Sequence, residues 1–181
     1  PVHEYEEGYF VFMATSAGTV KKTPLTAFSR PLSRGIIAID LREDEYLVGV
    51  AVTDGERDMM LFSSAGKAVR FRENEVRSLG RTAHGVRGIA LDPGQRVISM
   101  LVAEPGTVLS VTENGYGKRT AIEEFPTQGS GTKGVLSIST SERNGDQIGS
   151  VLVLPDDEIM LITEGGTLVR TTVAEIPVLS R

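Results

Sequence analysis

Residues 61–71 read LFSSAGKAVRF: an apolar run, a polar pair, a turn glycine and a second β-prone run. Two such runs around a glycine-containing turn are typical of a β-hairpin. The same pattern recurs at 12–23, 110–120 and 161–171, so that the hairpin glycines are Gly18, Gly66, Gly115 and Gly166. We call these the anchor glycines. They are separated by 48, 49 and 51 residues, which shows that the chain is a run of repeats.

A second set of glycines predicts the rest of each repeat. Gly35, Gly85 and Gly134 open β-prone runs at 35–39, 85–89 and 134–138, and turns then lead to fourth runs at 47–50, 97–100 and 148–151. A period near 49 residues with four strands indicates propeller-type blades. The chain has no tryptophan, which excludes WD40 repeats, and its single double glycine disfavours kelch repeats.

We therefore expect one partial all-β domain over residues 1–181, with three and a half repeats at roughly 9–53, 58–102, 106–153 and 157–181. Helix is expected only in short pieces such as 122–125. The apolar runs 59–62 and 159–162 predict strands that are covered on both faces. The residue ten positions after each anchor glycine is always apolar and is expected in the core: Phe28, Val76, Phe125 and Ile176.

Composition excludes several classes of protein. Apolar residues make up 40% and charged residues 24% of the 181 residues, which is typical of a globular protein. No apolar run approaches the ~18 residues of a membrane span, and the acidic start at 1–8 does not resemble a signal peptide. We interpret both ends as cut from a longer protein. The absence of cysteine excludes thiolate sites and fits a cytoplasmic location, and two histidines, His3 and His84, argue against a histidine-based metal site.

Basic residues recur in register although the net charge is −5. Four residues after each anchor glycine stands a cation: Lys22, Arg70, Arg119 and Arg170. In the second and fourth repeats, alternation with the flanking residues predicts that Arg70 and Arg170 face solvent. Further cations flank them or lie in the loops that follow, namely Lys21, Arg30, Arg34, Lys67, Arg72, Arg77, Arg81, Arg87, Lys118 and Lys133.

Three other turns, at 40–45, 54–58 and 156–158, are acidic, so the pattern predicts a basic band along one rim. Spaced cations suit the phosphates of a polyanion, and no recognition helix or aromatic platform is evident. We expect sequence-tolerant binding and bending of duplex DNA. Two alternatives are open: edge cations that block strand pairing, and a scaffold that binds an acidic protein.

No catalytic site and no metal site is expected. Tyr116 follows a tight turn, and the loop 115–118 does not have the spacing of a phosphate-binding P-loop. The acidic triplet 156–158 does not have the spacing of a calcium loop.

The octapeptide ENGYGKRT at 113–120 resembles a signature of the C-terminal domain of DNA gyrase A, as do GTVKKT at 18–23 and GVRGI at 85–89. The resemblance covers essentially the whole chain. It implies a β-pinwheel, a propeller-like disc of about six blades that exchange strands. It also implies a domain that wraps duplex DNA on its basic rim and supports ATP-dependent negative supercoiling by the bacterial topoisomerase.

The implied partners are DNA, the N-terminal core of gyrase A and the gyrase B protein, while ATP and Mg²⁺ belong to those other parts of the enzyme. The segment QGSGTKG at 128–134 departs from the heptad QRRGGKG of the family because it lacks both arginines. We interpret it as a degenerate copy. Topoisomerase IV has a related, more degenerate domain and is the alternative family member, but the regular spacing and the intact octapeptide favour gyrase.

Overall fold

The computed structural model describes residue 2 and residues 4–181, so that Pro1 and His3 lie outside the described part of the chain. Each anchor glycine lies between the two strands of a hairpin. The hairpins pair β1 (Phe10–Thr15) with β2 (Thr19–Pro24), β4 (Asp58–Ser63) with β5 (Lys67–Arg72), β8 (Thr107–Thr112) with β9 (Gly117–Ala121), and β12 (Glu158–Ile162) with β13 (Leu168–Thr172).

In three of the described sheets, a third strand from the same repeat pairs with the first strand of the hairpin. In two of them, a fourth strand from the next repeat pairs with the second strand of the hairpin. The third strands, β3 (Leu47–Thr53), β7 (Val97–Val102) and β11 (Gln147–Val153), pair with β1, β4 and β8. The fourth strands are β6 (Val86–Arg87), which joins β2, and β10 (Val135–Leu136), which joins β5. Strand exchange between neighbouring blades therefore links the repeats, and the expected all-β, propeller-like fold is confirmed.

The anchor glycine is needed at these strand exchanges for two reasons. Gly66 has a φ of +75°, which side chains disfavour. Its carbonyl also accepts hydrogen bonds from the amides of Ser137 (2.7 Å) and Ile138 (3.3 Å) in the next repeat. A Cβ at position 66 would lie 2.1 Å from the Ile138 carbonyl oxygen, so only glycine allows this approach.

The prediction of a strand at 35–39 is wrong, because this segment has no strand structure. The two equivalent runs contain strands of only two residues, and each pairs with the hairpin of the preceding repeat. Among the described residues, no preceding hairpin pairs with residues 35–39.

One-turn 3-10 helices follow the second strand of every hairpin, as expected for 122–125. They are η1 (Leu25–Phe28), η2 (Glu73–Glu75), η3 (Ile122–Glu124) and η4 (Val173–Glu175). The first residue of each is buried. Of the positions expected in the core, Val76 and Phe125 are buried, whereas Phe28 and Ile176 are half-buried.

The core lies between the blades. Met59 and Leu61 of β4 pack with Phe12 of the first repeat, while Met60 and Phe62 pack with the third repeat. Residues 59–62 are 0% exposed, which confirms that this apolar strand is covered on both faces. The same prediction for 159–162 is wrong: Met160 and Ile162 are 62% and 72% exposed, because no described residues cover that face.

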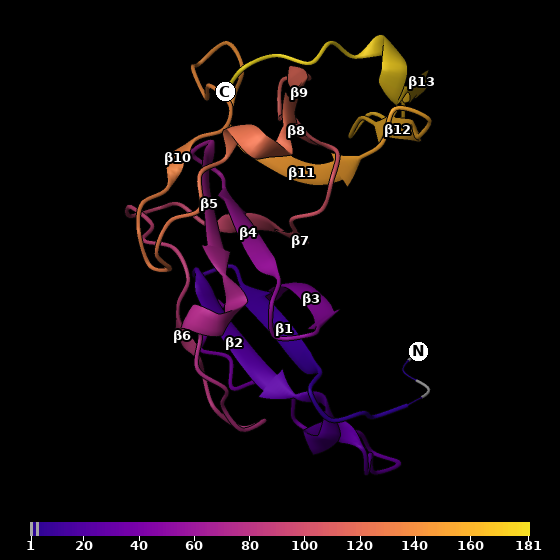
Figure 1. Ribbon diagram of the computed structural model, residues 1–181. Coiled ribbons are helices and arrows are strands. Elements are labelled where there is room, and N and C mark those ends of the chain that lie inside the picture. Colours follow the sequence, from indigo (N-terminus) through magenta and orange to yellow (C-terminus); the bar gives the residue numbers. More distant parts are fainter. Residues whose placement is uncertain (1, 3) are drawn as a thin grey trace.

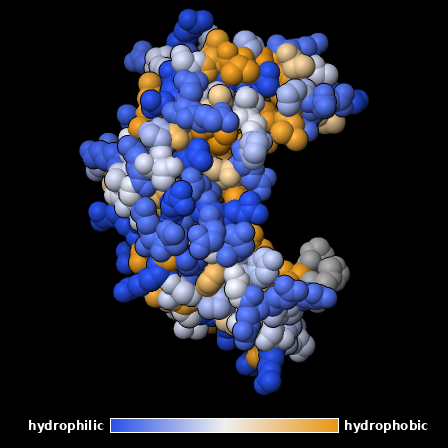
Figure 2. All heavy atoms as spheres, viewed as in Figure 1, coloured by the Kyte–Doolittle hydropathy of each residue, from blue (hydrophilic) through white to orange (hydrophobic). Residues whose placement is uncertain are grey.

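The sheets follow one another along an arc (Figure 1). Strands β3, β7 and β11 lie against one another at one end of the sheets, and β6 and β10 form the opposite, outer end. The space-filling view shows the arc hollowed on its right-hand side, while its left-hand, convex side is largely hydrophilic (Figure 2). None of the described helices is long and apolar enough to cross a membrane.

Candidate nucleic-acid interface

The in-register cations of the first three repeats reach across to the following repeat. We call the contacts between repeats 1 and 2, 2 and 3, and 3 and 4 the first, second and third junctions. Lys22 donates from Nζ to the Glu73 carbonyl (3.0 Å) at the first junction. Arg70 donates to the Ile122 carbonyl (3.1 Å) at the second, and Arg119 to the Ile176 carbonyl (2.8 Å) at the third. Each cation therefore donates to a carbonyl in, or directly after, the 3-10 helix of the next repeat.

The backbone repeats this arrangement at all three junctions. Short parallel bridges join Lys22 to Ser78, Arg70 to Thr127 and Arg119 to Val178. The carbonyls of the three cationic residues also accept backbone hydrogen bonds of 2.7–2.8 Å, from Leu79, Gln128 and Leu179. The recurring cation is thus part of a recurring inter-repeat contact.

Lys22 and Arg119 were expected among the ligand-binding cations, but they are buried, at 6% and 7% exposed. Arg70 is half-buried and also pairs with Asp58 at 2.9 Å. The second face of the Arg70 hairpin contacts the next blade and not water, so alternation along the strand does not place this side chain in solvent. Arg170 alone of the four is exposed, and it pairs with Glu158 of its own hairpin.

The flanking lysines also serve the junctions. Lys21 is 0% exposed, and its Nζ donates to the carbonyls of Ala38 (2.6 Å), Ala83 (3.0 Å) and Arg81. Burial, and then the nearby Arg81 guanidinium, lower the pKa of the Lys21 ammonium below its ordinary value, while Asp40 opposes the change. At the third junction Lys118 donates to the Ser180 carbonyl (2.6 Å), and burial lowers its pKa as well.

Other predicted cations are available to a ligand. Those that are exposed and have no ion pair within the described part of the chain are Arg30, Arg34, Lys67, Arg72, Arg77 and Arg87. They lie on the outer strand β6, on the neighbouring inner strand β5 of the next sheet, or in the loops after η1 and η2. Lys133 is exposed but pairs with Asp92 at 3.3 Å, and Arg81 is half-buried with its guanidinium on the Ile37 carbonyl (2.8 Å).

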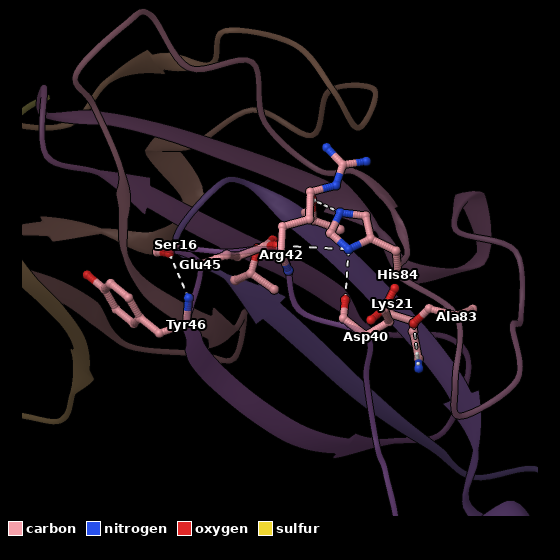
Figure 3. Close-up of polar contacts among 10 residues, drawn as sticks. Ser16, Lys21, Asp40, Arg42, Glu45, Tyr46, Ala83 and His84 are labelled. Atoms are coloured by element: carbon pink, nitrogen blue, oxygen red, sulfur yellow. Dashed lines mark hydrogen bonds and ion pairs between the residues drawn. The ribbon is translucent and has the colours of Figure 1, made fainter.

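Arg42 is a candidate that the sequence reasoning missed. It lies in the acidic turn 40–45, and the charge of that turn hid it. The structure places this exposed arginine near His84 and Arg87 of the second repeat, around one hollow of the surface. Figure 3 shows Arg42 and Glu45 beside the His84 imidazole, whose Nδ1 lies 2.8 Å from the Asp40 carbonyl oxygen. The closeness of Arg42 to Arg87 in space identifies it as a candidate, and the sequence does not show that closeness.

Comparisons with known proteins agree with this architecture. A family model for the DNA gyrase C-terminal domain, described as a beta-propeller, matches residues 9–54, 57–104, 106–155 and 157–181. The chain belongs to this family. Relatives in the family include DNA gyrase A of Salmonella typhimurium, 57% identical, and of Escherichia coli, 53% identical, each over 182 aligned residues. Both alignments cover 100% of this chain and 21% of the relative, so the chain spans about a fifth of the length of these proteins.

Solved structures related to the gyrase C-terminal domain family match as well. The C-terminal domain of DNA topoisomerase IV superposes with a TM-score of 0.93 at 28% identity, covering 100% of this chain and 57% of the other. The DNA gyrase A C-terminal domain gives a TM-score of 0.85 at 23% identity, covering 99% and 60%, and shows the likeness of the fold.

Tyr116, considered for catalysis, and Asp157, considered for cation binding, both make contacts within this gyrase-family domain. The Tyr116 hydroxyl accepts a hydrogen bond from Nε of Arg143 (2.9 Å), and the guanidinium lies 4.8 Å from the centre of the tyrosine ring. Asp157 accepts the Leu154 amide (2.7 Å) and closes its turn. In the part of the chain that the structure describes, no group of three acidic or histidine side chains is placed to hold a metal ion.

Proposed function

We propose that this domain binds duplex DNA through the phosphate backbone and bends it along the outer ends of the sheets. The observation that carries this proposal is the set of exposed arginines and lysines on β5, β6 and the adjoining loops that have no carboxylate partner among the described residues. Arginine and lysine bind phosphate oxygens with little dependence on base sequence. The described elements are strands and one-turn helices, so no recognition helix is available to read bases.

The proposed binding set is Arg30, Arg34, Lys67, Arg72, Arg77, Arg81, Arg87, Lys133 and Arg170. Lys21, Lys22, Arg70, Lys118 and Arg119 act indirectly in this proposal, because they hold the cation-bearing loops of neighbouring repeats together. A rim of spaced cations on a curved array favours a duplex that bends to follow it.

We further infer that the domain acts as the C-terminal domain of DNA gyrase A in a bacterial cytoplasm. There it would present wrapped DNA to the N-terminal core of gyrase A and to the gyrase B protein, which use ATP and Mg²⁺ for negative supercoiling. The 57% identity to a DNA gyrase A over the whole chain supports gyrase over topoisomerase IV, whose solved domain is 28% identical. We infer that this domain itself catalyses no reaction.

Binding of linear duplex DNA of unrelated sequences, measured by fluorescence anisotropy from 50 to 200 mM salt, tests the proposal. For six or more phosphate contacts, we expect affinity to fall about 10³-fold over this range. Salt-independent binding, or no binding at 50 mM salt, would contradict the proposal and favour the protein-scaffold alternative. Relaxing a plasmid in the presence of the domain then reports whether the bound DNA is wrapped and with which sign.

The exposed and buried cations provide a matched pair of variants. Arg72→Glu with Arg77→Glu should weaken DNA binding at unchanged melting temperature, because both side chains are exposed. Arg119→Glu should instead lower the melting temperature, because the buried cation holds the third junction. If Arg119→Glu abolished DNA binding while Arg72→Glu with Arg77→Glu left it unchanged, the proposed binding set would be contradicted.

A further inference from the structure

A hollow of about 280 Å³ lies at the first junction, between the tip of the β1–β2 hairpin and strand β6. Its walls come from two repeats: residues 17–19, Arg42 and Glu45 from the first, and residues 84–87 from the second. Arg42 and Arg87 are both exposed, and neither makes an ion pair within the described residues. Two free guanidinium groups at one hollow form a candidate anion site.

The backbone that carries Arg42 is fixed against the second repeat. The Asp40 amide donates to the Ala83 carbonyl (3.3 Å), and His84 Nδ1 lies 2.8 Å from the Asp40 carbonyl oxygen. The buried Lys21 ammonium joins the same two loops through the carbonyls of Ala38 and Ala83 (Figure 3). The position of Arg42 relative to β6 is therefore set before any ligand arrives, which reduces the entropy lost on binding.

The carboxylate in the wall of the hollow, Glu45, already accepts hydrogen bonds from other residues of the protein. Glu45 accepts the Thr15 hydroxyl (2.5 Å) and the Arg42 amide (2.9 Å), and its side chain is 3% exposed. It also lies 3.8 Å from His84 Nδ1. These contacts direct its charge inward, so the exposed part of the hollow is left to the two arginines.

The second junction lacks this free positive charge. Counted from the second set of glycines, the position of Arg42 is held there by Asp92, that of His84 by Lys133 and that of Arg87 by Leu136. Asp92 and Lys133 pair with each other at 3.3 Å. The two junctions therefore share a backbone arrangement, but the positive charge is neutralised by an ion pair at the second and has no ion pair among the described residues at the first. This difference argues that Arg42 and Arg87 serve a ligand and not the junction itself.

We propose that this hollow binds one phosphodiester group of duplex DNA, held by the guanidinium groups of Arg42 and Arg87, with His84 in the wall. This assignment rests on the proposed function and adds a fixed phosphate position at the boundary of two repeats. A phosphate held there by donors from both repeats would set the path of the duplex as it crosses from one blade to the next.

The test measures duplex affinity and its salt dependence for Arg42→Gln with Arg87→Gln. The matched control is Arg57→Gln with Arg96→Gln, which removes the same charge from two exposed arginines outside the hollow. Loss of one phosphate contact should weaken binding about eightfold at 0.1 M salt and lower the slope of log K against log salt by about one. The control should leave the slope unchanged.

A second variant, Arg42→Asp with His84→Lys, copies the neutral pair of the second junction and should weaken binding like the first variant while the fold is kept. If the wild-type domain does not bind duplex DNA at 50 mM salt, the proposed function fails. If the wild type binds but the Arg42/Arg87 variant matches the Arg57/Arg96 control, only the phosphate site fails.

Discussion

The first junction holds the charged Lys21 and Glu73 where the second holds the apolar Val69 and Ile122, although both have the same backbone arrangement. At the first, the buried or receiving positions hold Lys21, Lys22 and Glu73. At the second, the same positions hold Val69, Arg70 and Ile122. Parallel bridges, strand exchange and the contact on the anchor glycine occur at both. The comparison teaches that backbone geometry defines the junction, while side chains decide whether its stability depends on charge.

Glu73 shows how far the first junction relies on polar contacts. Its side chain is 0% exposed and accepts hydrogen bonds from the Thr53 hydroxyl (2.7 Å) and the Arg57 amide (2.9 Å). The equivalent first residues of the other 3-10 turns are Leu25, Ile122 and Val173, which are apolar and buried. Polar groups inside one junction can stabilise the fold only while every member keeps its partner.

The largest effect is expected from Lys21→Val, which gives the first junction the residue of the second. The carbonyls of Ala38, Arg81 and Ala83 then lose a buried donor, and an unsatisfied buried group costs about 1–3 kcal/mol. We expect the free energy of unfolding in urea to fall by about 3 kcal/mol. The exposed Lys67→Val is the matched control and should change it by less than about 0.5 kcal/mol. Equal effects of the two changes would show that the first junction does not depend on Lys21.

A smaller effect is expected from Arg70→Met, which removes the side-chain hydrogen bond from Arg70 to the next repeat at the second junction. Arg70 bonds to carbonyls of the next repeat and to Asp58, so its loss should cost about 2 kcal/mol of unfolding free energy. Arg170→Met is the comparison, because Arg170 makes the same in-hairpin pair with Glu158 but is exposed. It should cost less than about 0.5 kcal/mol. A similar loss for both would assign the stability to the hairpin pair and not to the junction.

The contrast between Arg70 and Arg170 also shows what the sequence could and could not predict. Local patterns were sufficient for the hairpins, because turn glycines and β-prone runs act within a few residues. The same basic position, four residues after the anchor glycine, is buried in Lys22 and exposed in Arg170, because burial depends on whether another repeat covers the strand. Alternation along one strand does not contain that information, so the predicted solvent face was wrong.

The composition of the candidate interface likewise depends on contacts between residues that are far apart in the sequence. The register of cations was visible in the sequence, but the division into junction contacts and exposed cations required the blades to be placed side by side. Arg42 was overlooked because its turn is acidic, and only the packing of 37–45 against 81–84 brings it to Arg87. Residues 35–39 failed as a strand for a related reason, since their pairing edge would belong to another repeat.

The smallest effect is expected in the pH dependence of stability at the first junction. Burial lowers the pKa of the Lys21 ammonium below its ordinary value of 10.5, which the unfolded chain retains. Between the lowered value and 10.5 the unfolded state binds more protons than the folded state, so stability gained from this group rises with pH. Below that window the cost of burying the charge is present in full, and above 10.5 no further change follows.

Lys21→Met removes this titration while keeping an apolar stem. The difference in unfolding free energy between wild type and variant should therefore widen as pH rises toward 10.5. Lys118, whose pKa is also lowered by burial, is present in both proteins and cancels from the difference. A difference that stays flat or narrows with pH would mean that the carbonyls around Lys21 stabilise its charged form enough to offset burial. The stability of the first junction would then be no more sensitive to pH than that of the second.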